Sequence, residues 1–182
     1  METNNILKVR KIFWAWQDEL EETWLESMAM KGFHFVDTTK FGTYTFMKGE
    51  PKKVRYCLDY QASQAEKEKY MHIFTDAGWE YIGQLNNWQY YRKEYEGDEA
   101  PEIFSDIESK IQKYNRVLAL FSTLLIPIGI LPIILANAVM SEGSHIYEFT
   151  RGFLTGIGIA FSAVSIFMIT GVSGRIREVK NR

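Results

Sequence analysis

Hydrophobic and polar positions divide the chain into two parts. Up to about Arg116 charged and aromatic residues are mixed, whereas segments 117–140 and 152–174 hold no charged side chain. At about 1.5 Å per helical residue, each segment is long enough to cross a hydrocarbon core about 30 Å thick. The pattern predicts two transmembrane helices joined by a short extracytoplasmic loop, 141–151.

The cations around these segments indicate their orientation. Three Lys or Arg residues lie within 98–116, which we interpret as a linker and juxtamembrane helix, and four lie in the basic tail 175–182, against one in the loop. Because Lys and Arg are retained on the cytoplasmic side, we expect a multi-pass protein of the cell membrane with both termini in the cytoplasm. Residues 1–20 lack a continuous apolar run, so no cleavable signal peptide is expected.

Residues 1–97 are predicted to form a cytosolic domain that begins with one strand-helix-strand-strand unit. The segment 11–16 is β-rich, and a helix is expected from Asp18, as its N-cap with Glu21 at capping-box spacing, to Gly32. Leu20, Trp24 and Met28 would form its apolar stripe. Two short β-rich runs around a turn at 40–42 then predict a hairpin.

A second unit follows with the same order of elements. Alternation predicts a strand at 54–60, a capping box of Ser63 and Glu66 starts a helix that ends at Gly78, and a turn at Asn86-Asn87 centres the second hairpin. The fold class is therefore predicted as α+β. Two βαββ units would give one antiparallel sheet with two helices on one face, followed by the transmembrane hairpin.

Composition narrows the chemistry. The single cysteine, Cys57, is expected to be a buried strand residue, which fits a cytosolic domain. The net charge of −2 does not favour binding to nucleic acid. The three histidines are isolated, and no phosphate loop or nucleophile motif is present, so we expect no metal, no cofactor and no enzymatic activity.

Several short motifs together resemble a bacterial family catalogued as domain of unknown function 2812. They are Trp24-Leu25-Glu26, Met28, Lys31-Gly32-Phe33, Tyr44-x-Phe46, Tyr56-x-Leu58-Asp59-Tyr60, Gly78-Trp79-Glu80 and Trp88-x-Tyr90-Tyr91-Arg92. The resemblance covers about residues 10–95. It implies C-terminal membrane spans in several members and genes often placed beside PadR-type transcriptional regulators, hence a role in regulation or stress response. It implies no catalytic residues. The doubled βαββ layout is also similar to GyrI-like effector-binding domains, which implies a cleft for amphipathic or cationic small molecules.

Aromatic residues of the front domain give the candidate ligand site. These rings could simply fill the core of a small domain. The alternative is a groove in which an apolar cation stacks, with Glu80, Asp59 or Glu22 as counter-charge. The candidate ligand-binding residues are Trp14, Trp16, Trp24, Tyr56, Asp59, Trp79, Glu80, Trp88 and Tyr90.

Small residues in the second apolar segment give a candidate helix-packing strip. Its members are Gly152, Gly156, Gly158, Ala160 and Ser162. Such a strip lets another helix approach closely, whether the first span, a second copy or another membrane protein.

Two functions are compatible with these patterns. The first is a non-enzymatic regulatory or sensor protein of the membrane, whose cytosolic domain binds a lipophilic small molecule or a protein. The alternative is an accessory subunit of a transport or resistance complex that docks through its transmembrane hairpin. Expected partners are thus the lipid bilayer and a regulator, a transporter subunit or a second copy of the chain.

Overall fold

A computed structural model describes residues 5–61, 71–101, 103, 107–138 and 145–181. Its contacts divide the chain into two compact units, Met1–Lys113 and Tyr114–Arg182. The predicted capping box of Ser63 and Glu66 and part of the loop 141–151 lie outside the described residues.

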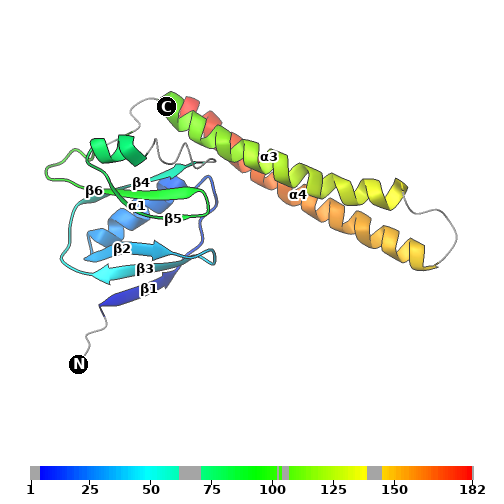
Figure 1. The fold of residues 1–182 in the computed structure, drawn as a ribbon, viewed down its shortest axis with the longest axis horizontal. Helices are drawn as coiled ribbons and strands as arrows, with labels where there is room; N and C mark the ends of the chain where they lie inside the picture. Colours follow the sequence, from blue (N-terminus) through cyan, green and yellow to red (C-terminus); the bar gives the residue numbers. More distant parts are fainter. Residues whose placement is uncertain (1–4, 62–70, 102, 104–106, 139–144, 182) are drawn as a thin grey trace. The chain divides into compact units, whose positions relative to one another are not determined.

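The first unit has α+β architecture, as predicted, and its described residues form six strands in two antiparallel sheets (Figure 1). A single antiparallel sheet was predicted, but the strands form two sheets of three strands each. The elements are β1 (Ile6–Arg10), α1 (Asp18–Ala29), β2 (Phe33–Thr38), β3 (Thr43–Lys48), β4 (Val54–Tyr60), β5 (Glu80–Leu85) and β6 (Trp88–Glu94). A further helical stretch is described over residues 71–76.

The two halves repeat one topology, which supports the predicted duplication. The strand orders are β1-β3-β2 and β4-β6-β5, so the last strand of each half is central. The second strand of each half in chain order carries a register shift at a matching place. The shift lies between Phe35 and Asp37 in β2 and between Tyr81 and Gly83 in β5. Both predicted hairpin turns are present, with Gly42 and Asn86 at positive φ.

The first strand was predicted in the wrong place. The β-rich segment 11–16 is a loop and turn, and β1 precedes it. The strand ends where Lys11 N–H donates to Gly42 O at 2.8 Å, and the chain then turns through Trp14, whose carbonyl accepts from Gln17 N–H at 2.8 Å. Bulky aromatic residues favour strands, but they serve equally in a loop that covers a core edge.

The predicted apolar stripe of α1 was wrong at Leu20, whereas Trp24 and Met28 do pack against the main core cluster. Leu20 is 60% exposed, and Trp24 and Met28 are only partly buried. The buried residues of the helix are instead Asp18, Glu21, Glu22, Leu25 and Ala29, and each of them lies three or four positions from another member. Asp18 is not the N-cap, since it is the first helical residue and Gln17 precedes the helix without a side-chain cap. The helix therefore turns an acidic face inward.

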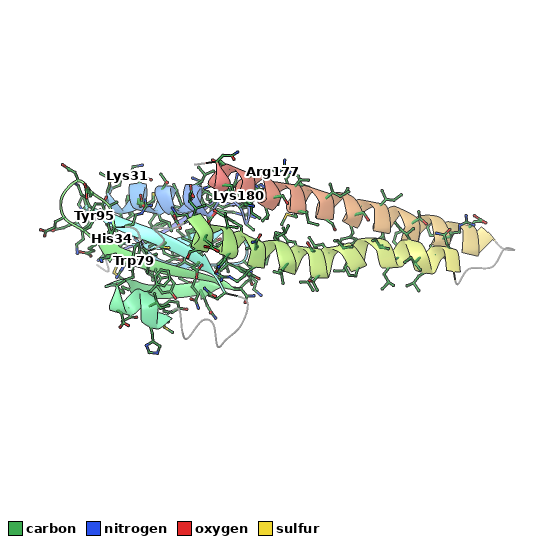
Figure 2. The ribbon with its side chains drawn as sticks, turned by 90° about the horizontal axis from the view of Figure 1, so that it is seen from above. Lys31, His34, Trp79, Tyr95, Arg177 and Lys180 are labelled. Carbon is green, nitrogen blue, oxygen red and sulfur yellow. The ribbon has the colours of Figure 1, made fainter. Side chains whose placement is uncertain are left out.

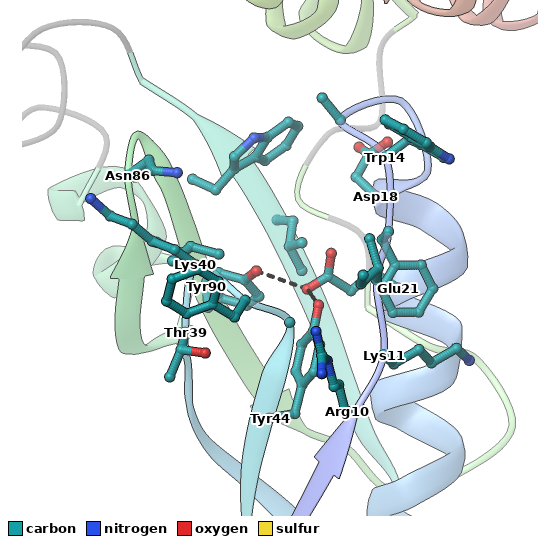
Figure 3. Close-up of a pocket in the computed structure, with 18 residues that line it drawn as sticks. Arg10, Lys11, Trp14, Asp18, Glu21, Thr39, Lys40, Tyr44, Asn86 and Tyr90 are labelled. Carbon is teal, nitrogen blue, oxygen red and sulfur yellow. Dashed lines mark hydrogen bonds between the residues drawn. The ribbon is translucent and has the colours of Figure 1, made fainter.

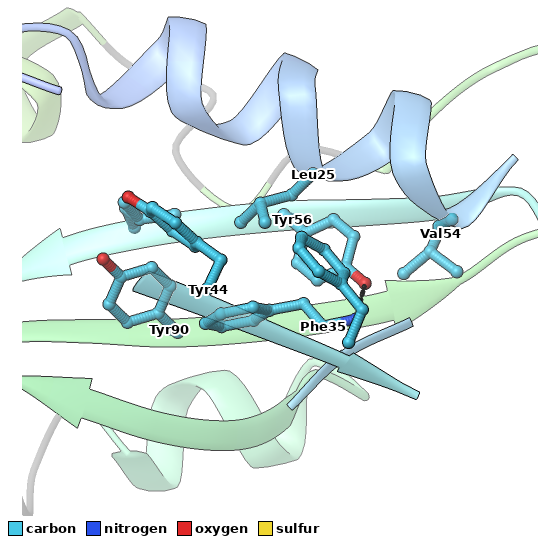
Figure 4. Packing of buried hydrophobic residues seen from close by; sticks show 9 residues of the cluster. Leu25, Phe35, Tyr44, Val54, Tyr56 and Tyr90 are labelled. Carbon is cyan, nitrogen blue, oxygen red and sulfur yellow. Dashed lines mark hydrogen bonds between the residues drawn. The ribbon is translucent and has the colours of Figure 1, made fainter. Parts of the chain in front are cut away.

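Both faces of β4 are buried, and this separates the two helices. Leu25 and Ala29 of α1 lie in one core cluster with Tyr56 and Leu58 (Figure 4). Phe74, from the helical stretch 71–76, lies in another cluster with Cys57 and stacks on Tyr91 at 3.8 Å. Since consecutive strand residues point to opposite faces, the helices cover opposite faces of the second sheet, not one face as predicted.

The second unit contains α3 (Ile107–Ala138) from Tyr114 onward and the whole of α4 (His145–Lys180). Both helices are long and apolar enough to cross a membrane, and only 11% of the most apolar 18-residue stretch of each is buried. Their side chains extend outward along both helices, and Arg177 and Lys180 lie at the C-terminal end of α4 (Figure 2). These helices are consistent with membrane association.

Part of the small-residue strip lies between α3 and α4. A Cβ at Gly158 would come within 2.8 Å of the Gly129 carbonyl oxygen, and one at Gly129 within 2.6 Å of Ser162 Oγ. By contrast, a Cβ at Gly152 or Gly156 would meet nothing within 4 Å. The strip is therefore split between a packed pair of positions and an open face.

Candidate functional site

A pocket of about 360 Å³ opens in the first unit, where the loop after β1 and the β2–β3 turn meet α1 and the β5–β6 turn (Figure 3). Its size is within the range of sites for small molecules. Aromatic rings make up much of the wall, and both halves of the duplication contribute to it. The aromatic lining residues are Phe13, Trp14, Phe41, Tyr44, Trp88 and Tyr90.

Glu21 supplies a carboxylate inside this pocket. Its Oε1 accepts hydrogen bonds from the hydroxyls of Tyr44 and Tyr90, both at 2.8 Å, as Figure 3 shows. Burial raises the pKa of Glu21 above its ordinary value, and the two hydroxyls act in the opposite direction. The charge on Glu21 is therefore only partly stabilised by the protein and would be stabilised further by a bound cation.

Glu22 and Glu26 have a different role, at the outer edge of β4. Leu58 N–H donates to Glu22 Oε1 at 2.7 Å, and Tyr56 N–H donates to Glu26 Oε1 at 3.4 Å. No strand pairs with this edge within the described sheets, so the carboxylates satisfy backbone donors that a neighbouring strand would otherwise take. Burial raises the pKa of Glu22 to about 8, with Asp18 acting in the same direction and Lys113 against it.

Asp18 lies beside the same cluster and forms a buried ion pair with Lys113, the last residue of the first unit. Lys113 Nζ also donates to the Leu58 carbonyl at 3.2 Å. A buried charge is tolerated when it is paired and hydrogen-bonded. Asp18 is thus compensated within the protein by a cation, whereas the donors that hydrogen-bond Glu21 in the described part of the pocket are two neutral hydroxyls.

The mouth of the pocket is lined by the last residue of β1 and by two adjacent loops, and we call these side chains the rim patch. Lys11 Nζ lies 4.6 Å from the centroid of the Trp24 ring and 4.8 Å from that of Phe13, in cation-π geometry. Large apolar side chains protrude beside the cations. The rim patch comprises Arg10, Lys11, Ile12, Trp14, Lys40 and Phe41.

The structure brings together three of the nine predicted ligand residues, Trp14, Trp88 and Tyr90. Trp16 stacks on Trp14 with centroids 5.6 Å apart. The others lie elsewhere. Tyr56 belongs to the main core cluster, Trp24 packs against that cluster, and Trp79 belongs to the cluster around Phe74. Asp59 is buried and accepts from the Gln61 amide, and Glu80 is ion-paired with Arg92 on the surface.

Sequence reasoning missed Glu21 as the pocket carboxylate and the two loops as its mouth. A signal was present in the spacing of Asp18, Glu22, Leu25 and Ala29, which share one face of a helix. The apolar residues at 20, 24 and 28 gave a competing stripe with more hydrophobic members. Nothing local to the helix identifies Tyr44 and Tyr90 as partners, because they are 23 and 69 residues away.

Comparisons with known proteins agree with the resemblance drawn from the motifs. Neither curated proteins nor solved structures gave a match. A family model described as "Protein of unknown function (DUF2812)" matches residues 17–126, more than half of the chain, from the start of α1 into α3. The chain therefore belongs to the DUF2812 family.

Proposed function

We propose that this protein is a non-enzymatic sensor anchored in the cell membrane, whose N-terminal domain binds an apolar organic cation in the pocket around Glu21. The observation that carries the proposal is a buried carboxylate with two tyrosine hydroxyls, surrounded by aromatic rings. Rings attract cations through their π faces, and a carboxylate adds a full opposite charge. The proposal includes the expectation that the protein has no catalytic activity.

The two long apolar helices, α3 and α4, support the proposed membrane anchoring. Lys and Arg at 110–116 and 175–182 favour a two-span arrangement with both termini in the cytoplasm, and hence a cytosolic pocket. A regulatory role is supported by this combination of a membrane anchor with a ligand-sized pocket. The PadR neighbourhood implied by the family resemblance is in keeping with such a role.

Ligand titration of the full-length protein in detergent tests the proposal. Two tryptophans, Trp14 and Trp88, line the pocket, so an aryl ammonium or aryl phosphonium ion that binds there should quench tryptophan fluorescence in a saturable way. Glu21→Gln keeps the side-chain shape and removes the charge. We expect affinity about tenfold lower or worse, since loss of one favourable charge contact of about 1.4 kcal/mol gives that factor.

The matched control is Glu80→Gln, which removes a carboxylate on the surface of β5 outside the pocket. Its affinity should equal that of the wild type. A neutral aryl compound of similar size should bind wild type and Glu21→Gln equally. Equal affinities of the cations for all three proteins, or no saturable quenching across the panel, would refute the proposal.

The alternative, an accessory subunit of a transport or resistance complex, is favoured by one observation. Gly152 and Gly156 face open space, which leaves room for a helix of another protein. Replacing both by leucine should abolish copurification of a membrane partner while leaving cation binding unchanged. Crosslinking in native membranes followed by mass spectrometry would identify that partner; recovery of the chain alone would count against this alternative.

A further inference from the structure

The rim patch has a composition that the pocket alone does not explain. Phe41 is 78% exposed and Ile12 is 68% exposed, the two highest values among the large apolar side chains described in the first unit. Trp14, at 46%, protrudes beside them. A ligand buried in the pocket would be covered by the inner rings, and it would not need apolar side chains that point into solvent.

Charge on these loops has a single sign. Residues 10–17 and 39–42 contain Arg10, Lys11 and Lys40 and no acidic residue. The acids nearest in the pocket lining, Asp18 and Glu21, are buried and engaged by Lys113 and by the two tyrosines. The exposed surface of the rim patch is therefore cationic and apolar together.

The two loops of the rim patch are held against each other by backbone hydrogen bonds. Lys11 N–H donates to Gly42 O at 2.8 Å, and Gly42 N–H donates to Thr39 O at 2.9 Å. A Cβ at Gly42 would come within 2.3 Å of the Lys11 carbonyl oxygen and 3.1 Å of Ile12 Cγ1, so the loops touch. Phe41 and Ile12 consequently protrude from adjacent backbone segments.

We propose that the rim patch docks on an anionic lipid surface, with Phe41, Ile12 and Trp14 inserted at the level of the headgroups and Arg10, Lys11 and Lys40 against the lipid phosphates. Aromatic side chains favour the membrane interface, and each Lys or Arg near an anionic surface raises binding about fivefold. The same chain carries two helices that could span a membrane, so the bilayer is present at high effective concentration. The pocket would then open at the bilayer, where apolar ligands accumulate.

A fluorescent reporter in the full-length, reconstituted protein tests the docking. The variant Phe41→Cys is labelled with an environment-sensitive dye, and the matched control is Met30→Cys, another exposed apolar position, 61% accessible and next to Lys31. Bilayers of phosphatidylcholine with or without phosphatidylglycerol carry a lipid-attached quencher. Cys57→Ala removes the native thiol; if that variant does not fold, Cys57 can stay, because it is buried and burial raises the pKa of its thiol, which makes it react slowly.

We expect the lipid quencher to reduce fluorescence at position 41 severalfold more than at position 30, and only when phosphatidylglycerol is present. Arg10→Glu together with Lys40→Glu, or salt near 1 M, should remove the difference. Equal quenching at the two positions would overturn the proposal. Quenching at position 41 that is equally strong with and without phosphatidylglycerol would also overturn it. A shift of the dye emission at position 41 without lipid quenching would overturn it as well, and would indicate that a protein covers this surface.

Discussion

Replacing Glu22 by glutamine should make the first unit less sensitive to pH. The pKa of Glu22 is raised from 4.5 to about 8 in the folded protein, mainly by burial. Between these values the folded chain keeps a proton on Glu22 that the unfolded chain releases. Unfolding therefore releases a proton, and the free energy of unfolding falls as pH rises, by about 1.4 kcal/mol per pH unit for this one group.

The Glu22→Gln variant cannot take part in this exchange, and its amide oxygen can still accept from Leu58 N–H. Its stability relative to wild type should thus increase by about 2–3 kcal/mol between about pH 5.5 and pH 7.5. For a domain of this size, that corresponds to a difference in melting temperature that widens by roughly 10–20 °C. Glu21 and Glu26, whose pKa values are also raised, are common to both proteins and cancel in the comparison.

Thermal unfolding of the full-length protein in detergent can be followed by tryptophan fluorescence, because all five tryptophans lie in residues 14–88. Glu19→Gln serves as the control, since Glu19 is on the same helix but not among its buried residues. Its difference from wild type is measured over the same pH range as a reference. If the Glu22→Gln difference changes no more with pH than this reference does, the buried, protonated state of Glu22 is wrong.

Three further experiments test packing, two of them with a matched control substitution. Leu25→Ala, at a fully buried site, should lower the free energy of unfolding of the first unit by about 2–5 kcal/mol in chemical denaturation, whereas Leu20→Ala should lower it by less than about 0.5 kcal/mol. Equal losses would mean that Leu20 is buried as the sequence pattern predicted. Gly158→Leu should destabilise the helical hairpin by about 1–3 kcal/mol or more, seen as a lower midpoint in loss of helical circular dichroism, while Gly152→Leu should leave the midpoint unchanged. Gly32→Ala should lower the free energy of unfolding of the first unit by more than about 1 kcal/mol in chemical denaturation, because φ is +81° and the new Cβ would lie 2.5 Å from a backbone oxygen. An unchanged midpoint would contradict that geometry.

The candidate site was only partly predictable. Trp14, Trp88 and Tyr90 were named because aromatic residues are common in ligand sites, and they do line one pocket. Tyr56 and Trp79 belong to the same class of residue and lie in core clusters without lining the pocket, whereas Tyr90 belongs to the same core cluster as Tyr56 and lines the pocket as well. Residue type alone cannot separate these cases, since what lies opposite a ring decides whether it faces a pocket, a core or both.

The sequence by itself determined the elements whose signal is local. Four of the six strands fall within the predicted hairpin runs, β4 matches its predicted bounds, and the two apolar helices follow from length and hydropathy, because these are properties of one segment. Tertiary structure alone decided which face of α1 is buried and which carboxylate enters the pocket. An acidic side chain can be buried only if distant groups satisfy it, and here those groups are the Tyr44 and Tyr90 hydroxyls, the outer edge of β4 and Lys113.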